Sequence, residues 1–558
     1  MSLSTHISAE KVLKASREHS QKHGRSSIHD LMGRDNPGSY DLGPAADRYD
    51  TEPIPKYSIP SKGVPPRVAY DLVTSELALD GKPFTNLASF VHTSMDEYGD
   101  RLTYENRAIN LIDGDEYPAT QMIHARLVSM VAKLWHAADQ GENATGCATT
   151  GSSEAAQLGG LAMKKIWQER RKAQGKSIHE PGPNIVMGAN AQVALEKFAR
   201  YFDVEARMVP VDASTNYVMD PKRAMQYVDE NTIGVFVILG STYTGTYEDV
   251  KGMSDLLDEY EAKTGNFVPI HVDAASGGFF APFATPSLTW DFKLPRVVSI
   301  NASGHKYGKA YVGVGIIVWR DKKHLPKDLV FTLTYLGSVE HSFSLNFSRP
   351  AAPIIGLYYN LISLGFEGYR RIALHDAKNA RLFSKALENS KYYKVVSRGH
   401  LPKETSITEK VKETVGTADA IDSYIPTLPV VAFKFSDEFA REYPRIKQVE
   451  IQKKLRQREW IVPNYDLPPN AEKEEVLRVV FREKFSEDLT ERLFSDIIEI
   501  TEQLMAEHKA DVPHPGQGAG QEDLHNGIIA GSKGQTIHEK IASSHGEGTK
   551  PVGHDSYC

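Results

Sequence analysis

Apolar and polar positions follow two different periods along the middle of the chain. Short apolar runs typical of buried strands lie at 184–187, 206–211, 234–239, 267–272 and 297–300. Between these runs, apolar residues recur with helical spacing over 155–166, 192–201, 221–230 and 253–264. Strands that alternate with helices of this length favour a mostly parallel sheet with helices on both faces. The pattern therefore predicts an α/β fold for this region.

The pattern changes after this region. A long helical stretch covers 349–387, and a smaller α+β pattern follows, with strands at 430–435 and 476–481 and helices at 449–459 and 488–508. The first eighty residues are mostly polar and Pro- and Gly-rich, which is typical of an extended arm, and the Gly-, His- and Ser-rich end is typical of disorder. We therefore divide the chain into an arm (1–80), a large domain (81–375), a small α+β domain (376–512) and a tail (513–558).

Composition narrows the class of protein. The chain has 558 residues, of which 25% are charged and 41% hydrophobic, and its net charge of −7 gives no electrostatic case for nucleic-acid binding. We expect neither a secretory signal nor a membrane span, because the first thirty residues lack an apolar stretch and no apolar run is long enough. The two cysteines, Cys147 and Cys558, fit a reducing compartment, so we expect a cytoplasmic protein.

Two reactive side chains follow neighbouring predicted strands. Asp273 ends the strand at 267–272, and Lys306 follows the strand at 297–300 after a short turn-prone stretch. In open parallel sheets, ligands bind beside the carboxyl ends of the strands. A desolvated lysine amine can form a Schiff base, and a carboxylate can hold a cationic ring nitrogen, so the pair suits pyridoxal 5′-phosphate (PLP). The competing interpretation is a surface lysine at a hairpin tip, with Asp273 bound only to backbone N–H groups.

A phosphate site is predicted beside this pair. Gly151, Ser152 and Ser153 stand where a helical stripe begins, so free N–H groups, two hydroxyls and the positive end of a helix dipole converge there. His305, next to Lys306, would add a positive or hydrogen-bonding group. A serine at a helix start is common, and a single histidine is more often structural than catalytic. The hypothesis therefore depends on the whole set and its order along the chain.

Several longer motifs resemble those of one enzyme family. HVDAASGGFFAPF, SINASGHKYGKAYVGVGIIVWRD, TTGSSEA, STYTGTYE, NFSRP and VLRVVF resemble segments of the group II PLP-dependent decarboxylases, specifically the bacterial, plant and fungal glutamate decarboxylases. The resemblance covers roughly Leu79 to His508. It implies an aspartate-aminotransferase-like (fold type I) large domain and the conversion of L-glutamate to 4-aminobutanoate (GABA) and CO2. It also implies a homodimer or higher oligomer with shared active sites.

The resemblance also implies roles for single residues. The catalytic residues would be Lys306 as the Schiff-base lysine, Asp273 as the partner of the ring nitrogen, His305, and Tyr335 on a mobile loop. Cofactor contacts would also come from Ser152, Ser153, Gln192, Thr242, Ala275, Ser303 and, from a neighbouring subunit, Ser348. Substrate contacts would come from Ser89, Phe90, Arg478 and, from a partner subunit, Asn110 and Asp113. Two positions depart from the bacterial pattern, because Ser89 replaces a threonine and Glu196 replaces a histidine.

Other functions stay open on the sequence alone. A decarboxylase of aspartate or of an aromatic amino acid would share these motifs, and a non-catalytic regulator with the same fold is disfavoured by intact Lys306, Asp273 and Arg478. The C-terminal histidines could form a pH-dependent plug, with a solvated tail as the alternative; they are His508, His514, His525, His538, His545 and His554. Plant relatives carry a calmodulin-binding tail, but this tail lacks tryptophan and a basic amphipathic helix, so calmodulin is not expected. We expect no metal site.

Overall fold

The computed structural model describes residues 57–333, 340–403 and 423–510. The chain forms two compact units, 1–80 and 81–558. Helix α3 (Pro66–Leu77) is in the first unit and has no buried residue. Most of the predicted arm and all of the predicted tail (513–558) lie outside the described residues. No helix in the described ranges is both long and apolar enough to cross a membrane.

A seven-stranded sheet forms the centre of the second unit. Its strands are β1 (Thr145–Thr149), β2 (Asn184–Gly188), β3 (Glu205–Val209), β4 (Thr232–Ile238), β5 (Ile270–Asp273), β6 (Val297–Ser303) and β7 (Gly315–Trp319). Their order in the sheet is β1-β7-β6-β5-β4-β2-β3, and only β7 runs against the others. The predicted mostly parallel sheet is thus confirmed, and the carboxyl ends of six strands share one edge.

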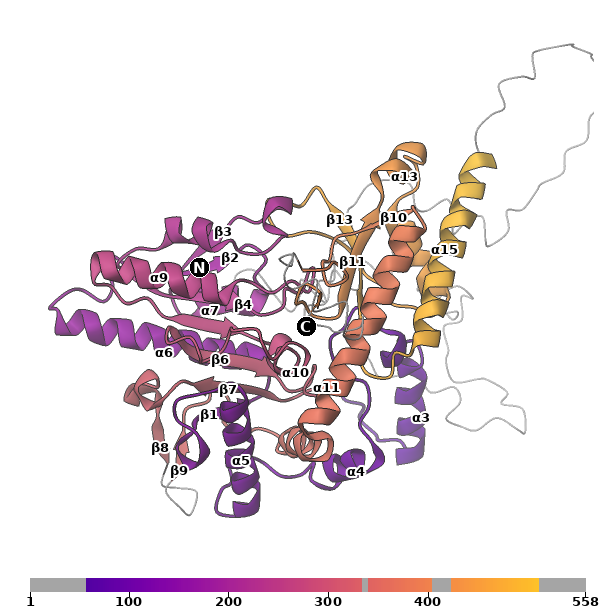
Figure 1. The fold of residues 1–558 in the computed structure, drawn as a ribbon. Helices are drawn as coiled ribbons and strands as arrows, with labels where there is room; N and C mark the ends of the chain where they lie inside the picture. The colour runs from indigo at the N-terminus through magenta and orange to yellow at the C-terminus, as the bar shows by residue number, and fades with distance from the viewer. Residues whose placement is uncertain (1–56, 334–339, 404–422, 511–558) are drawn as a thin grey trace, which may run out of the picture. The chain divides into compact units, whose positions relative to one another are not determined.

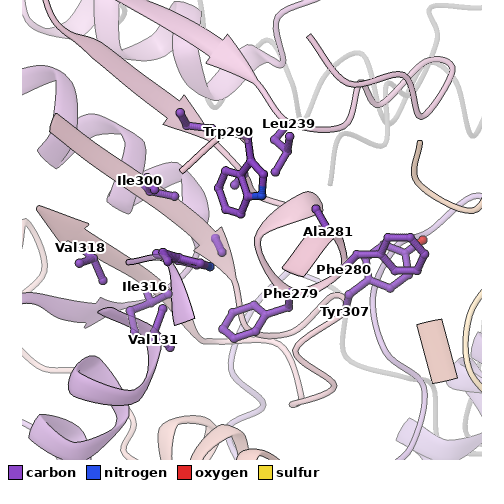
Figure 2. Packing of buried hydrophobic residues seen from close by; sticks show 14 of the residues in the cluster. Val131, Leu239, Phe279, Phe280, Ala281, Trp290, Ile300, Tyr307, Ile316 and Val318 are labelled. Atoms are coloured by element: carbon purple, nitrogen blue, oxygen red, sulfur yellow. The ribbon is translucent and has the colours of Figure 1, made fainter. Parts of the chain in front are cut away.

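Helices cover both faces of this sheet (Figure 1). One face packs against α6 (Ser152–Ala173) and α7 (Val193–Tyr201), and the other against α5 (Pro118–Leu134), α9 (Val250–Thr264) and α10 (Ala281–Ala284). Figure 2 shows part of the larger core, in which Val131 of α5 and the Trp290 ring lie with Ile300 of β6 and Ile316 of β7. Each such side chain contributes about 1.5–3 kcal/mol on burial. Apolar packing on both faces therefore stabilises the sheet.

A second, four-stranded antiparallel sheet follows in the chain. Its strands, in sheet order, are β10 (Tyr393–Val395), β11 (Val430–Phe435), β13 (Glu475–Val480) and β12 (Asn464–Asp466). It shares a core with α14 (Gln448–Gln457), α15 (Glu487–Ala510) and the second half of α11 (Ala352–Asn389). The first half of α11 packs in the core of the large sheet, so this helix connects the two sheets (Figure 1). The remaining helices and strands of the described ranges are α4 (Glu97–Glu105), α8 (Pro221–Ala224), α13 (Asp437–Glu442), β8 (Phe331–Leu333) and β9 (Glu340–Ser342).

The differences from the predicted elements have local causes. The helix predicted over 349–387 is interrupted at Gly365, whose φ of 57° and ψ of −176° are not helical. The helix predicted over 221–230 ends at Ala224 and continues as a 3-10 turn. Strand β1 was not predicted, because its sequence TGCAT has few bulky apolar residues. It forms nevertheless, since it pairs with the fully buried β7 along its whole length.

Candidate active site

A pocket lies at the carboxyl edge of the large sheet. Its walls come from segments that end or follow β1, β2, β4, β5 and β6, namely Ser152, Ser153, Asn190, Gln192, Ala194, Ile238, Gly240, Thr242, Asp273, Ala275, Ser276 and Lys306. Strands that are far apart in the sequence thus deliver their following residues to one place, as expected for a parallel sheet. Seven of the residues predicted to bind the cofactor line this pocket: Ser152, Ser153, Gln192, Thr242, Asp273, Ala275 and Lys306.

Lys306 is buried, with 6% of its surface exposed. Its Nζ lies 3.4 Å from Ser276 Oγ and 5.3 Å from the centre of the Phe90 ring. The interpretation of Lys306 as a surface residue at a hairpin tip is therefore wrong. Strands β6 and β7 are antiparallel neighbours, and the hydrogen bond from Gly304 N to Val314 O continues their ladder up to the residues before Lys306.

The two oxygens of Asp273 have different surroundings. Oδ1 accepts hydrogen bonds from Ala275 N at 3.1 Å and from Asn301 Nδ2 at 2.9 Å. Within the described ranges no donor reaches Oδ2, although the residue is only 7% exposed and lines the pocket. Backbone binding, the competing interpretation, thus accounts for one oxygen only. The second oxygen can accept a hydrogen bond from a ligand.

The N-terminus of α6 provides an anion site in the wall of the same pocket. No side chain caps the first turn of α6, so its N–H groups keep their capacity to bind a ligand. Ser303 Oγ donates to Ser152 Oγ at 2.8 Å, which brings the end of β6 to this turn. An added Cβ at Gly151 would meet the His305 ring at 3.8 Å, so that ring is close to the same helix end.

His305 is a neutral group in this arrangement. Its Nδ1 donates to Val314 O at 3.0 Å. Burial, helped by the positive charge of Lys306, lowers the pKa of His305 to about 4. Of the two properties that the sequence allowed for His305, hydrogen bonding and positive charge, the geometry favours the first.

Two other pocket residues are held by the local backbone. Gln192 caps α7, because its side-chain oxygen accepts from Ala194 N at 2.7 Å. Gly240 follows β4 with a φ of +110°, a conformation that residues with a Cβ rarely adopt. The turn at Gly240 brings Thr242 back to the pocket.

Arg478, on β13 of the small sheet, reaches the large sheet. Its two terminal nitrogens donate to backbone oxygens, one to Thr242 O at 2.6 Å and the other to Ala88 O. Its guanidinium carbon lies 5.2 Å from the centre of the Phe90 ring, the ring that also faces Lys306. Its Nε is buried without a hydrogen-bond partner. The structure thus brings Phe90 close to both Arg478 and Lys306.

Three other predicted residues form a cluster of their own. Asn110 Nδ2 lies 3.4 Å from both Asp113 Oδ1 and Ser348 Oγ, and Asn110 Oδ1 accepts from Arg349 N at 3.0 Å. None of the three lines the pocket of its own chain. Tyr335 lies outside the described residues.

Sequence reasoning missed two groups behind the pocket. Glu248 is buried and accepts from Ile238 N at 2.7 Å and from Asn190 Nδ2 at 2.9 Å, and burial raises its pKa to about 7. His271 is fully buried two residues before Asp273. The available signal for His271 was the pattern H-x-D on a strand that was otherwise apolar.

Known proteins share much of the sequence and the fold of this chain. Residues 74–404 match the family described as "Pyridoxal-dependent decarboxylase conserved domain". The chain is 47% identical over 460 residues to a glutamate decarboxylase of Solanum lycopersicum, covering 82% of this chain and 85% of the relative. It is 46% identical over 479 residues to a glutamate decarboxylase of Saccharomyces cerevisiae, covering 82% and 81%. A solved glutamate decarboxylase of Lactobacillus brevis superposes with a TM-score of 0.74 at 36% identity, covering 82% of this chain and 97% of that one.

Proposed function

We propose that this chain, which belongs to the pyridoxal-dependent decarboxylase family, converts L-glutamate to 4-aminobutanoate and CO2. The observation that carries the proposal is the buried Lys306 in one pocket with Asp273 and the uncapped end of α6. The choice of glutamate is supported by the plant, yeast and bacterial relatives, all of which are named as glutamate decarboxylases.

The pocket residues fit PLP in three places. The N–H groups of α6, with Ser152, Ser153 and Ser303, would hold the phosphate. The Lys306 amine would bind the aldehyde, and Asp273 Oδ2 would accept from the ring nitrogen. When bound, the cofactor supplies a protonated ring that takes up the electron pair left by departing CO2.

Arg478 is the residue that we assign to the α-carboxylate of the substrate. It is 7% exposed, and no carboxylate in the described ranges forms an ion pair with it. Its partners are backbone oxygens and aromatic rings, none of which is negatively charged. A buried cation without a counter-charge is unfavourable, and a carboxylate ligand would supply that charge. By holding that carboxylate, Arg478 would fix which bond of Cα breaks, while Tyr335 would place the new proton on Cα.

Ser89 and Phe90 would contact the distal carboxylate of the substrate, together with Asn110 and Asp113 of a second subunit. The support is that Asn110 and Asp113 cluster with Ser348 outside the pocket of their own chain. This assignment requires a homo-oligomer with shared sites. We further propose that the protein is cytoplasmic, because its two cysteines fit a reducing compartment. Mixing two inactive variants, Lys306→Ala and Asn110→Ala, should restore part of the activity, because some hybrid sites then carry neither change.

The decisive experiment is a product assay. Purified protein with added PLP is incubated with L-glutamate, L-aspartate or L-tyrosine, and the amine and CO2 are identified. We expect 4-aminobutanoate from L-glutamate, and neither turnover nor the visible absorbance of bound cofactor in Lys306→Ala. Preference for tyrosine or aspartate would contradict the substrate assignment, and activity in Lys306→Ala would contradict the role of the lysine.

A further inference from the structure

Four polar side chains are paired across two neighbouring buried strands. In the register of β5 and β6, His271 is opposite Ser299 and Asp273 is opposite Asn301. Residues two positions apart on a strand share a face, so the four side chains lie together on one face of the sheet. All four are buried, and three of them have no exposed surface. Such a polar ladder inside an apolar core is unfavourable unless every group is hydrogen-bonded.

Three hydrogen bonds connect the four side chains in a line that ends on Asp273. His271 Nδ1 lies 2.7 Å from Ser299 Oγ, and His271 Nε2 lies 2.6 Å from Asn301 Oδ1. Asn301 Nδ2 donates to Asp273 Oδ1 at 2.9 Å. An ionised carboxylate only accepts, so it fixes which end of the Asn301 amide faces it.

The orientation of the Asn301 amide fixes the donor and the acceptor in each of the other two hydrogen bonds. With its amide nitrogen turned to Asp273, Asn301 presents an oxygen to His271, so His271 Nε2 must carry the proton. His271 Nδ1 is then an acceptor, and it receives the hydroxyl proton of Ser299. Every donor therefore points toward the carboxylate.

The surroundings of His271 keep it neutral and fixed in place. The Phe236 ring meets its edge at a centroid distance of 5.1 Å, and an added Cβ at Gly159 of α6 would come within 2.4 Å of Nδ1. Burial lowers the pKa of His271 to about 4, against the opposing pull of the Asp273 charge. A neutral His271 donates to Asn301 without competing for the negative charge of Asp273.

We propose that Ser299, His271 and Asn301 are positioning residues, which fix the orientation of Asp273 and turn its Oδ2 toward the pocket for the ring nitrogen of PLP. The inference rests on the proposed function and deepens it. Two donors, Ala275 N and Asn301 Nδ2, occupy Oδ1 and leave Oδ2 as the oxygen for the ligand. These three hydrogen-bonded side chains act on the cofactor only through Asp273, because none of the three lines the pocket.

The test compares two asparagines that are both fully buried on strands of the same sheet. Asn301→Ala removes the hydrogen bond from the Asn301 side chain to Asp273. Asn184→Ala removes hydrogen bonds from a network at the opposite end of the sheet. The dissociation constant is measured for PLP and for 1-deaza-PLP, in which a C–H group replaces the ring nitrogen. We expect Asn301→Ala to weaken PLP about tenfold to a hundredfold and to leave 1-deaza-PLP nearly unchanged. Asn184→Ala should change neither constant.

The outcomes separate the inference from the proposed function. Equal weakening of both cofactors by Asn301→Ala, or no weakening of either, would overturn the inference while leaving PLP binding intact. A wild-type protein that binds no PLP would instead refute the proposed function, and the inference with it. Ser299→Ala provides a milder variant, for which we expect a several-fold weakening of PLP alone, since it removes only the distant donor.

Discussion

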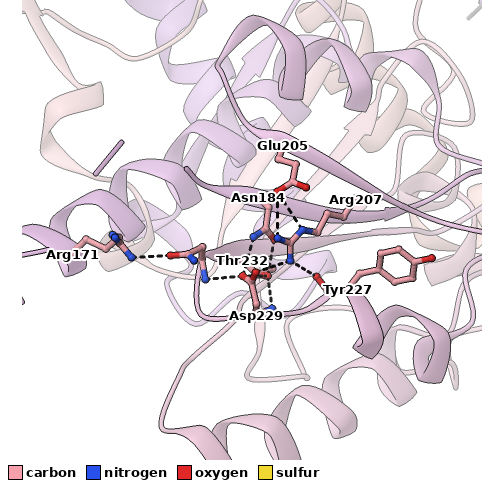
Figure 3. Close-up of polar contacts among 8 residues, drawn as sticks. Arg171, Asn184, Glu205, Arg207, Tyr227, Asp229 and Thr232 are labelled. Carbon is pink, nitrogen blue, oxygen red and sulfur yellow. Dashed lines mark hydrogen bonds and ion pairs between the residues drawn. The ribbon is translucent and has the colours of Figure 1, made fainter. Parts of the chain in front are cut away.

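Two buried polar networks lie at opposite ends of the large sheet, and they differ in whether they close on themselves. At the amino ends of the parallel strands, the side chains of Arg171, Asn184, Arg207, Asp229 and Thr232 all have protein partners, and Tyr227 joins their network through its backbone oxygen (Figure 3). At the carboxyl ends, Asp273 Oδ2 receives no donor from the described residues, and Arg478 Nε and Asn190 Oδ1 are buried without partners. A closed network stabilises the fold, whereas unsatisfied buried atoms gathered around one pocket indicate a missing ligand.

The closed network explains why the amino end needs no ligand. Asn184 on β2 donates to Asp229 at 2.9 Å and accepts from Thr232 on β4 at 2.7 Å. Arg207 on β3 adds an ion pair to Asp229 at 2.7 Å, and Arg171 on α6 donates to the Asn231 side chain at 2.7 Å (Figure 3). These contacts connect three strands and a helix at one edge, so their loss should reduce stability and spare the reaction.

The largest difference between the two networks is expected when one arginine of each is replaced by lysine. Arg478→Lys keeps a cation near the pocket but loses the forked donors that bind Thr242 O and Ala88 O. We expect kcat/KM for L-glutamate to fall by about thirtyfold to several thousandfold, the equivalent of about 2–5 kcal/mol. Arg207→Lys, the matched control, should leave kcat/KM within about twofold and lower the free energy of unfolding. Similar losses of kcat/KM in both variants would contradict the distinction between the two networks.

The pH dependence of stability should also separate the two ends. His271 and His305, near the pocket, have pKa values of about 4 because they are buried, whereas an unfolded histidine has its pKa near 6.5. As the pH falls from about 6.5 to 4, the unfolded chain binds protons that the folded chain does not, so stability falls. We expect each histidine to contribute up to about 1.4 kcal/mol per pH unit in that window.

The amino end should respond only at lower pH. Burial alone would raise the pKa of Asp229, but hydrogen bonds from Asn184 and the backbone of Asn231, with Arg207, lower it below its usual value. Its contribution to stability is therefore lost only as the pH falls below about 4. Urea unfolding measures the free energy of unfolding at several pH values between 6.5 and 5. The dependence of this free energy on pH should be weaker in His271→Leu than in the wild type, and unchanged in Asp229→Asn. An unchanged dependence in His271→Leu would show that His271 titrates normally in the fold.

The contrast also shows what the sequence could predict. The spacing of apolar residues predicted most strands of the large sheet and most helices that cover it. A buried strand or helix face needs apolar side chains, whichever elements it packs against. The residues that follow the strand ends, Asp273 and Lys306, could be predicted for the same reason: in a parallel sheet, topology alone places them at one edge. The closed network could not be predicted, since its members are ordinary polar residues at strand starts. Only the register between strands shows that Asn184 meets Thr232, or that His271 is opposite Ser299.

A smaller effect is expected from Thr232→Val at the closed end. Valine has nearly the shape of threonine, so the change mainly removes the hydroxyl that donates to Asn184 Oδ1 and accepts from Asp229 N at 2.9 Å. We expect the free energy of unfolding to fall by about 1–2 kcal/mol, with kcat/KM and the dissociation constant of PLP unchanged. Equilibrium unfolding in urea measures the first, and the product assay and a PLP titration measure the others. A loss of PLP affinity would mean that the two ends of the sheet are coupled.

The smallest effect is expected at Glu196, where the resemblance to the bacterial enzymes leads us to expect a histidine. Glu196 lies in the first turn of α7 and pairs with Arg200 at 3.3 Å, and the Arg200 side chain is 79% exposed. Such a surface pair, one turn apart on a helix, contributes at most about 0.5 kcal/mol. Glu196 does not line the pocket, although Gln192, which caps the same helix, does. Glu196→Gln should therefore lower stability by a few tenths of a kcal/mol and leave kcat/KM within about twofold. A larger change in PLP affinity would show that the cap at Gln192 transmits the charge of Glu196 to the cofactor.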